Sequence, residues 1–214
     1  MTRHTLAAVT VVAALALSAC SVDGAQDDNA HPASPDRPTA TGTGPYPDPA
    51  ESAADASPLP AGKSGQPHGG IPSPGDVRQT DATEVTRGAL TAMWTSDTTL
   101  DTTQQDATRR AARAGWLTPT YAAQLTKYQP HAAPGAEWAQ WSRHRAYTTV
   151  HVQDTPDAGQ PGDTDTTAYR QITLTVTPHG RDKWTGQPAT YAVFVVLSRA
   201  DKGRPWRLSA TTVQ

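Results

Sequence analysis

Side chains able to do chemistry are sparse in this sequence and follow none of the common catalytic spacings. The 214 residues contain one cysteine and seven histidines, and no two histidines beyond residue 80 lie four residues apart, the spacing that pairs metal ligands on one helix face. The sequence also lacks a G-x-S-x-G elbow, an S-x-x-K pair, an H-E-x-x-H helix, a phosphate-binding loop and a C-x-x-C pair. We therefore predict no catalytic residues, no cofactor and no metal site.

The one cysteine, Cys20, follows a short apolar segment. Residues 6–17 read LAAVTVVAALAL, which matches the core of a signal peptide and is shorter than the roughly 20 residues that span a bilayer. Residues 17–20, Leu-Ser-Ala-Cys, resemble the lipobox of bacterial lipoproteins. This resemblance implies removal of a signal peptide at 1–19, a lipid thioether on Cys20 and fatty acylation of the new amino terminus. Such a chain is anchored to the outer, extracytoplasmic face of the cell membrane.

An alternative is a secreted chain that keeps Cys20 as a free thiol, which suits an oxidising compartment poorly. The composition adds two points. The formal net charge is −2 and neither half of the chain is strongly basic, which argues against a nucleic-acid partner. Arginine outnumbers lysine 14 to 4 while alanine, threonine and proline are abundant, so the codons are GC-rich and we expect an actinobacterial source.

Residues 20–79 are predicted to form a disordered tether that carries the lipidated cysteine. Positions 21–79 hold 11 of the 19 prolines and 8 of the 16 glycines, with few large apolar side chains. Such a segment cannot bury enough surface to offset the entropy of ordering. A flexible chain of this length spans roughly 45 Å. The alternative is that its Pro-x-Pro clusters are a ligand for a partner domain.

The segment 80–214 begins with three predicted helices. Asp81 and Glu84 have the spacing of a capping box ahead of an apolar stripe, which predicts a helix that fades near residue 96. A second helix is predicted at about 103–114, with Asp106 four residues ahead of Arg110 and with Gly115 and Trp116 closing its end. A third helix starts at Thr118 and has Tyr121, Leu125 and Tyr128 on one face.

The rest of the segment is predicted to be β. Apolar residues alternate along three of four stretches, and the remaining one, the third in the chain, is apolar on both faces, as in a central strand. The predicted strands are 145–153, 168–177, 190–199 and 206–213. Three helices followed by four antiparallel strands give an α+β domain.

Four stretches of this domain carry a family resemblance. AMWTSDT, the WLTP-x-Y-A-A stretch, PGAEWAQW and the TPHGRDKWTG loop look like parts of small actinobacterial lipoproteins and conjugation-associated proteins. The resemblance implies a cystatin-like fold of the nuclear-transport-factor type, in which helices pack into the concave side of a strongly bent sheet. It also implies an accessory role in an envelope assembly, for conjugation or secretion.

Enzymes of that fold, isomerases and dehydratases among them, place an acid and a base inside the cone between sheet and helices. The acids of this chain fall mostly in predicted loops, so the inward candidates are tyrosines, which are more often core residues than catalysts. They are Tyr121, Tyr147, Tyr169 and Tyr191.

The most conspicuous mixed cluster is EWAQWSRHR. Trp138, Trp141, Arg143 and Arg145 form a candidate partner-binding patch, because tryptophan and arginine are enriched at interface hot spots. The alternative is that the tryptophans close the edge of the core while the arginines stay in solvent. The sequence thus favours a non-catalytic interaction module with an envelope protein partner. A carrier of a small apolar ligand in the cone, or an enzyme that uses the same cone, are the alternatives.

Overall fold

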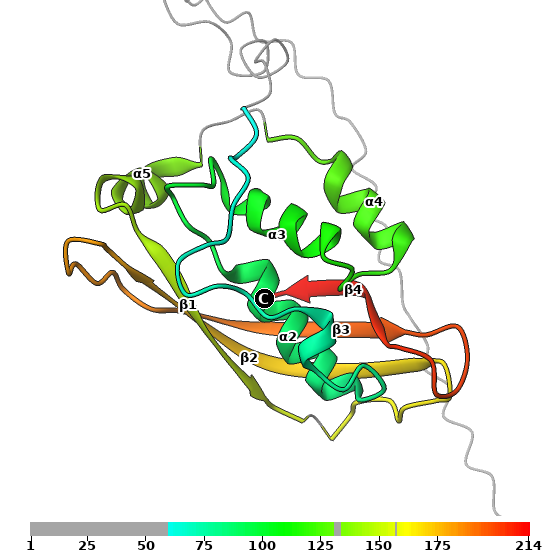
Figure 1. Cartoon of the computed structure of the whole chain (residues 1–214). Helices are drawn as coiled ribbons and strands as arrows, with labels where there is room; N and C mark the ends of the chain where they lie inside the picture. Colours follow the sequence, from blue (N-terminus) through cyan, green and yellow to red (C-terminus); the bar gives the residue numbers. More distant parts are fainter. Residues whose placement is uncertain (1–59, 131–133, 157) are drawn as a thin grey trace, which may run out of the picture. The chain divides into compact units, whose positions relative to one another are not determined.

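A computed structural model describes residues 60–130, 134–156 and 158–214; the signal peptide, Cys20 and most of the predicted tether lie outside the described residues. The described chain is α+β, with four α-helices and one antiparallel sheet of strand order β1-β2-β3-β4 (Figure 1). No helix in this part of the chain is long and apolar enough to span a membrane. The elements are η1 (Pro74–Asp76), α2 (Ala82–Trp94), α3 (Gln104–Arg113), α4 (Pro119–Lys127), α5 (Gly135–Arg143), β1 (Tyr147–Asp154), β2 (Thr167–His179), β3 (Ala189–Ser198) and β4 (Arg207–Val213).

Helix α2 contacts all four strands and forms the centre of the core (Figure 1). The Asp81 carboxylate caps it by accepting from the backbone N–H groups of Thr83 and Glu84. Glu84 does not complete the predicted capping box, because its carboxylate accepts from the backbone N–H and the guanidinium of Arg78 instead. The predicted apolar stripe is confirmed, since Val85, Ala89, Ala92 and Met93 are all buried.

The junction between α3 and α4 follows the sequence signals closely. Gly115 has φ +86, and the N–H groups of Gly115 and Trp116 donate to the carbonyls of Ala112 and Ala111, which is a Schellman motif. Thr118 then caps α4 through its hydroxyl. The predicted face of α4 is wrong at one position: Tyr128 lies beyond the helix end and is 61% exposed.

A fourth helix, α5, is a correction to the predicted three. Pro130 and Pro134 mark the end of the third helix in the sequence, but Pro134 is also the N-cap of α5. Proline lacks an N–H, which the first turn of a helix does not use, so it can start a helix as well as end one. Trp138 and Trp141, three residues apart, lie on the buried face of α5.

The sheet buries one face against the helices and leaves the other open. Ile172, Leu174, Val193 and Val195 point into the core, whereas Phe194 on the opposite face is 36% exposed. The prediction that β3 is a central strand is confirmed, because β3 pairs with both β2 and β4, although one of its two apolar faces is open to solvent.

A β-bulge in β4 changes which of its residues face the core. The pairing shifts between Val196 and Leu197, which face Ala210 and Leu208, so Ser209 is the extra residue. The bulge moves Ala210 out of phase with Trp206 and Leu208, and Ala210 is exposed.

Residues 60–79 lie against the domain. The Lys63 N–H donates to the Leu100 carbonyl (2.7 Å), and the Trp206 N–H donates to the Gln79 carbonyl (2.8 Å). Ile71 and Val77 pack against the main core. These contacts lie before the domain boundary predicted at residue 80.

Candidate functional site

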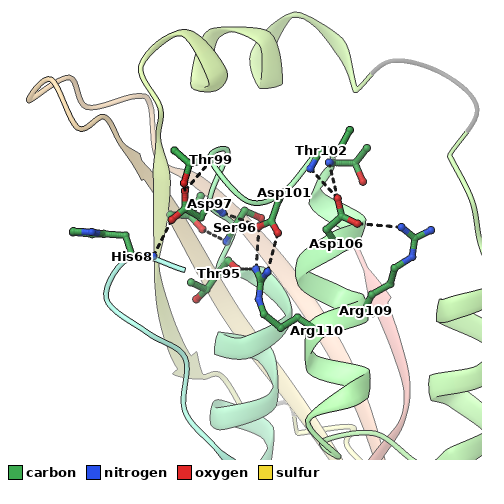
Figure 2. Close-up of polar contacts among 12 residues, drawn as sticks. His68, Thr95, Ser96, Asp97, Thr99, Asp101, Thr102, Asp106, Arg109 and Arg110 are labelled. Carbon is green, nitrogen blue, oxygen red and sulfur yellow. Dashed lines mark hydrogen bonds and ion pairs between the residues drawn. The ribbon is translucent and has the colours of Figure 1, made fainter. Parts of the chain in front are cut away.

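Three carboxylates gather where the loop after α2 meets α3 (Figure 2). The first, Asp97, is 1% exposed and forms a two-point ion pair with Arg181, with N–O distances of 3.1 and 2.8 Å. It also accepts from the N–H and hydroxyl of Thr99 and from the backbone N–H of His68 (2.9 Å). Four donor groups therefore hold this one side chain.

These donors decide the charge of Asp97. Burial by itself raises the pKa of a carboxyl because it disfavours the ionised form. The hydrogen bonds from Arg181, Thr99 and the His68 backbone outweigh burial and bring the pKa of Asp97 down to about 2, from 3.8. Asp97 is ionised at neutral pH and cannot serve there as a proton donor.

The other two carboxylates are held in the same way (Figure 2). Asp101 pairs with Arg110 at 2.8 and 3.0 Å and accepts the backbone N–H of Asp97. Asp106 accepts from the N–H groups that precede α3 and from Arg109 (3.1 Å). The predicted i, i+4 partner of Asp106, Arg110, is thus taken by Asp101, because the loop folds back over the start of α3.

The bonds of this carboxylate cluster suit it to holding the loop 95–103 in place and not to proton transfer. Each oxygen faces a fixed backbone, hydroxyl or guanidinium donor, so a water or substrate would have to displace a charge-assisted bond. In the described part of the chain, no three His, Cys, Asp or Glu side chains come together to hold a metal ion. The cluster ties the loop 95–103 to α3 and to the β2–β3 loop.

The cone between α2, α3 and the sheet contains a cavity of about 160 Å³. Trp94 and Tyr191 form one wall, with ring centroids 4.9 Å apart. Burial, with a smaller contribution from Glu137, raises the pKa of Tyr191. The Thr148 hydroxyl also lines the cavity but is already engaged with the Ser96 N–H and the Trp94 carbonyl.

Of the four tyrosines predicted to point inward, Tyr191 is the one that lines this cavity. The Tyr121 hydroxyl bonds to Thr211 at 2.7 Å, and the Tyr147 ring packs against His68 at the surface end of β1. Tyr169 lines a separate hollow on the open side of the sheet, beside Phe194.

No protein-family model, no curated protein and no solved structure matches this chain. The four stretches that carried the resemblance nevertheless have a common place in the fold. AMWTSDT and the TPHGRDKWTG loop meet through the Asp97–Arg181 pair. PGAEWAQW meets the same loop through a small tryptophan core, and Trp116 of the WLTP stretch fills the main core at 1% exposure.

The candidate partner patch divides into a buried and an exposed half. Trp138 and Trp141 are each 6% exposed and pack with Ala146 and Trp184, while Arg143 and Arg145 are exposed. This arrangement agrees with the alternative interpretation from the sequence, in which the tryptophans close the edge of the core and the arginines stay in solvent. A role of the two arginines in binding a partner stays a prediction.

The aromatic ring at the surface beside these arginines is Trp184. It is half-buried, stacks on His144 with ring centroids 4.3 Å apart and is held by the bond between His144 and Asp182 (2.7 Å). We call Arg143, His144, Arg145 and Trp184 the α5 surface. No sequence pattern indicates that Trp184 belongs to this surface, because it lies in a loop 40 residues from the cluster, where periodicity does not indicate contacts.

Proposed function

We propose that this chain is a lipid-anchored, extracytoplasmic protein whose C-terminal domain is a non-catalytic interaction module, an accessory subunit of an envelope assembly for conjugation or secretion. The lipobox ending at Cys20 supports the anchor. The order of helices and strands and the placement of α2 across the sheet are compatible with a cystatin-like domain. The proline-rich residues before 60 would serve as the tether.

The observation that carries the proposal is the α5 surface. Two exposed arginines flank His144 in the chain, His144 stacks on Trp184, and Trp184 packs on the buried Trp138 and Trp141. Aromatic and arginine side chains on a rigid base dominate the binding energy of protein interfaces. The buried carboxylate cluster adds to the rigidity of the same end of the domain through Arg181, which also donates to the Arg145 carbonyl.

A carrier is the second candidate, because of the cavity in the cone. Its volume of about 160 Å³ is enough for a ligand about the size of a single aromatic ring. Its walls mix apolar rings with the polar side chains of Gln104 and Thr108. An enzyme that uses the cone would have Tyr191 as its ionisable group, and we consider this the weaker alternative.

Crosslinking in the native cell, followed by purification through this chain, tests the proposal. We expect Cys20→Ala to stop the incorporation of labelled fatty acid and to move the protein out of the membrane pellet after a high-salt wash, which screens electrostatic binding. We expect Arg143→Glu with Arg145→Glu to stay in the pellet but to lose the crosslinked envelope proteins. Arg113→Glu with Lys127→Glu makes the same change of charge at two exposed positions elsewhere and should retain them.

Two results would contradict the proposal. Retention of Cys20→Ala on membranes washed at high salt, which removes protein bound only by electrostatic attraction, would refute the lipid anchor. Recovery of no protein with the parent chain, together with a co-purified small molecule, would favour the carrier.

A further inference from the structure

A groove with three arginines lies between the β3–β4 loop and the start of α4. Its volume is about 420 Å³, and Arg199, Arg204 and Arg207 line it together with Thr118 and Pro119. No acidic side chain is among the residues that line it. The groove is at the opposite end of β3 from the cavity-lining residues Ala189 and Tyr191, so it is separate from the sites described above.

Neutral groups orient two of the three guanidinium groups, those of Arg199 and Arg207. Arg199 donates from Nε to the Asp165 carbonyl (2.6 Å) and lies 4.1 Å above the centre of the Trp206 ring. Arg207 donates to the Trp206 carbonyl (2.6 Å) and to the side-chain oxygen of Gln79 (2.7 Å). The Arg204 side chain is exposed and has no polar partner among the described residues. The three arginines therefore line one groove, and none of their guanidinium groups is bonded to a carboxylate among the described residues.

The pKa values of arginines in this domain differ between those that are bonded to a carboxylate and those that are not. Hydrogen bonds to Glu84 and Asp163 raise the pKa of Arg78 and Arg170. Burial lowers the pKa of Arg207, with no carboxylate to offset it. A half-buried cation of this kind is stabilised when an anion enters the groove.

Three acidic residues neighbour these arginines, and the side chain of each bonds to a group outside the groove. Asp163 pairs with Arg170, and Asp165 pairs with Lys202 at 3.4 Å. Asp201 accepts from the backbone N–H of Lys202, next to it in the chain. Helix α4 adds potential of the same sign, because its N-terminal residues Thr118 and Pro119 are part of the groove wall.

We propose that this arginine groove binds the phosphate of an anionic phospholipid headgroup, so that the domain lies on the membrane surface. Guanidinium groups donate two parallel bonds to phosphate oxygens, which suits this ligand. The assignment to a lipid rests on the proposed anchor at Cys20, which would hold residue 60 at a root-mean-square distance of roughly 35 Å from the bilayer. A lipid anchor combined with a cationic patch is a stable form of membrane attachment.

Vesicle binding by the processed chain 20–214 with Cys20→Ala, which has neither the apolar signal segment nor an acyl group, tests the groove apart from the anchor. We expect it to co-sediment with phosphatidylcholine vesicles that contain phosphatidylglycerol and far less with pure phosphatidylcholine. Arg204→Gln should weaken this binding about 5-fold, and Arg199→Gln with Arg204→Gln about 25-fold, at roughly 1 kcal/mol per cation. The matched control is Arg113→Gln, an exposed arginine on α3 without a side-chain partner in the described part of the chain, which should bind like the parent.

Three outcomes would overturn the proposal. Equal binding to both kinds of vesicle excludes recognition of the anionic headgroup. An equal effect of Arg113→Gln and Arg204→Gln excludes the groove as the site. Calorimetric binding of inorganic phosphate, abolished by Arg204→Gln, without any vesicle binding would make the groove a site for free phosphate. Each result leaves the anchor at Cys20 untouched, because the protein in this experiment is not acylated.

Discussion

At the scale of single residues, Asp97 couples folding to protonation. Its pKa is about 2 in the folded protein, against an ordinary value of 3.8. A carboxyl whose pKa is lower in the folded state stabilises that state above its unfolded pKa, and this contribution is lost as the pH falls through the folded value. At 1.36 kcal/mol per pKa unit, Asp97 contributes about 2 kcal/mol above pH 4, which disappears between about pH 4 and pH 2.

Removing the partner of Asp97 should therefore be costly. We expect Arg181→Ala to lower the free energy of unfolding at pH 7 by about 3 kcal/mol, because it leaves a buried carboxylate without its cation. The pKa of Asp97 should rise in this variant, so less of the stability that remains is lost on acidification to pH 3. Urea unfolding at pH 7 and pH 3 measures both effects, with Arg113→Ala as the control. Equal midpoints for the two variants at pH 7 would show that the ion pair contributes nothing.

The sequence predicted the position of Asp97 in a loop but not its environment. Its partner Arg181 is 84 residues away along the chain. Periodicity indicates which residues share a face of one element, and it contains no information about pairs between distant loops. For the same reason the carboxylate cluster and the contact of Trp184 with α5 were not predicted, whereas Gly115 and Thr118, whose roles are local, were.

At the scale of elements, caps and alternation predicted three helices and all four strands. The errors arose where two signals compete at one place. Pro134 is compatible with the end of one helix and with the start of the next, so the sequence did not predict α5. In β4 the bulge at Ser209 interrupts the alternation, and no residue type in that stretch marks it.

Gly88 in the middle of α2 shows how packing between elements overrides helix propensity. Alanine is favoured over glycine inside a helix by about 1 kcal/mol. A Cβ added at Gly88, however, would lie 2.8 Å from Cζ3 of the buried Trp116 indole. We therefore expect Gly88→Ala to destabilise the domain by about 1–3 kcal/mol in thermal or urea unfolding.

The control for Gly88→Ala is Thr91→Ala on the same helix. Thr91 is only partly buried, and its hydroxyl bonds to the Arg87 carbonyl one turn earlier. Alanine should be neutral or slightly stabilising there. If Gly88→Ala stabilises the protein, the Trp116 ring can move aside, and the close contact between α2 and Trp116 does not determine how they pack.

At the scale of the whole molecule, contacts with the domain begin before the boundary that composition predicts at residue 80. The stretch 60–79 has the proline and glycine content of a tether, yet Ile71 and Val77 pack against the main core. The His68 N–H also donates to Asp97. Two apolar side chains and a few backbone hydrogen bonds are enough to fix a segment against a preformed surface, and an average over composition does not detect them.

Two shortened chains measure what this segment contributes. We expect a chain that begins at residue 80 to be about 3 kcal/mol less stable than one that begins at residue 60. The estimate combines roughly 2 kcal/mol for two half-buried apolar side chains with about 1 kcal/mol for the bond to Asp97, and it takes the other backbone bonds to offset the entropy of ordering the segment. Urea unfolding at pH 7 compares the two chains, and Ile71→Ala with Val77→Ala in the longer chain separates the apolar part from the hydrogen bond. Equal urea midpoints for the two shortened chains would mean that residues 60–79 belong to the tether, because a segment that adds no stability is not part of the fold.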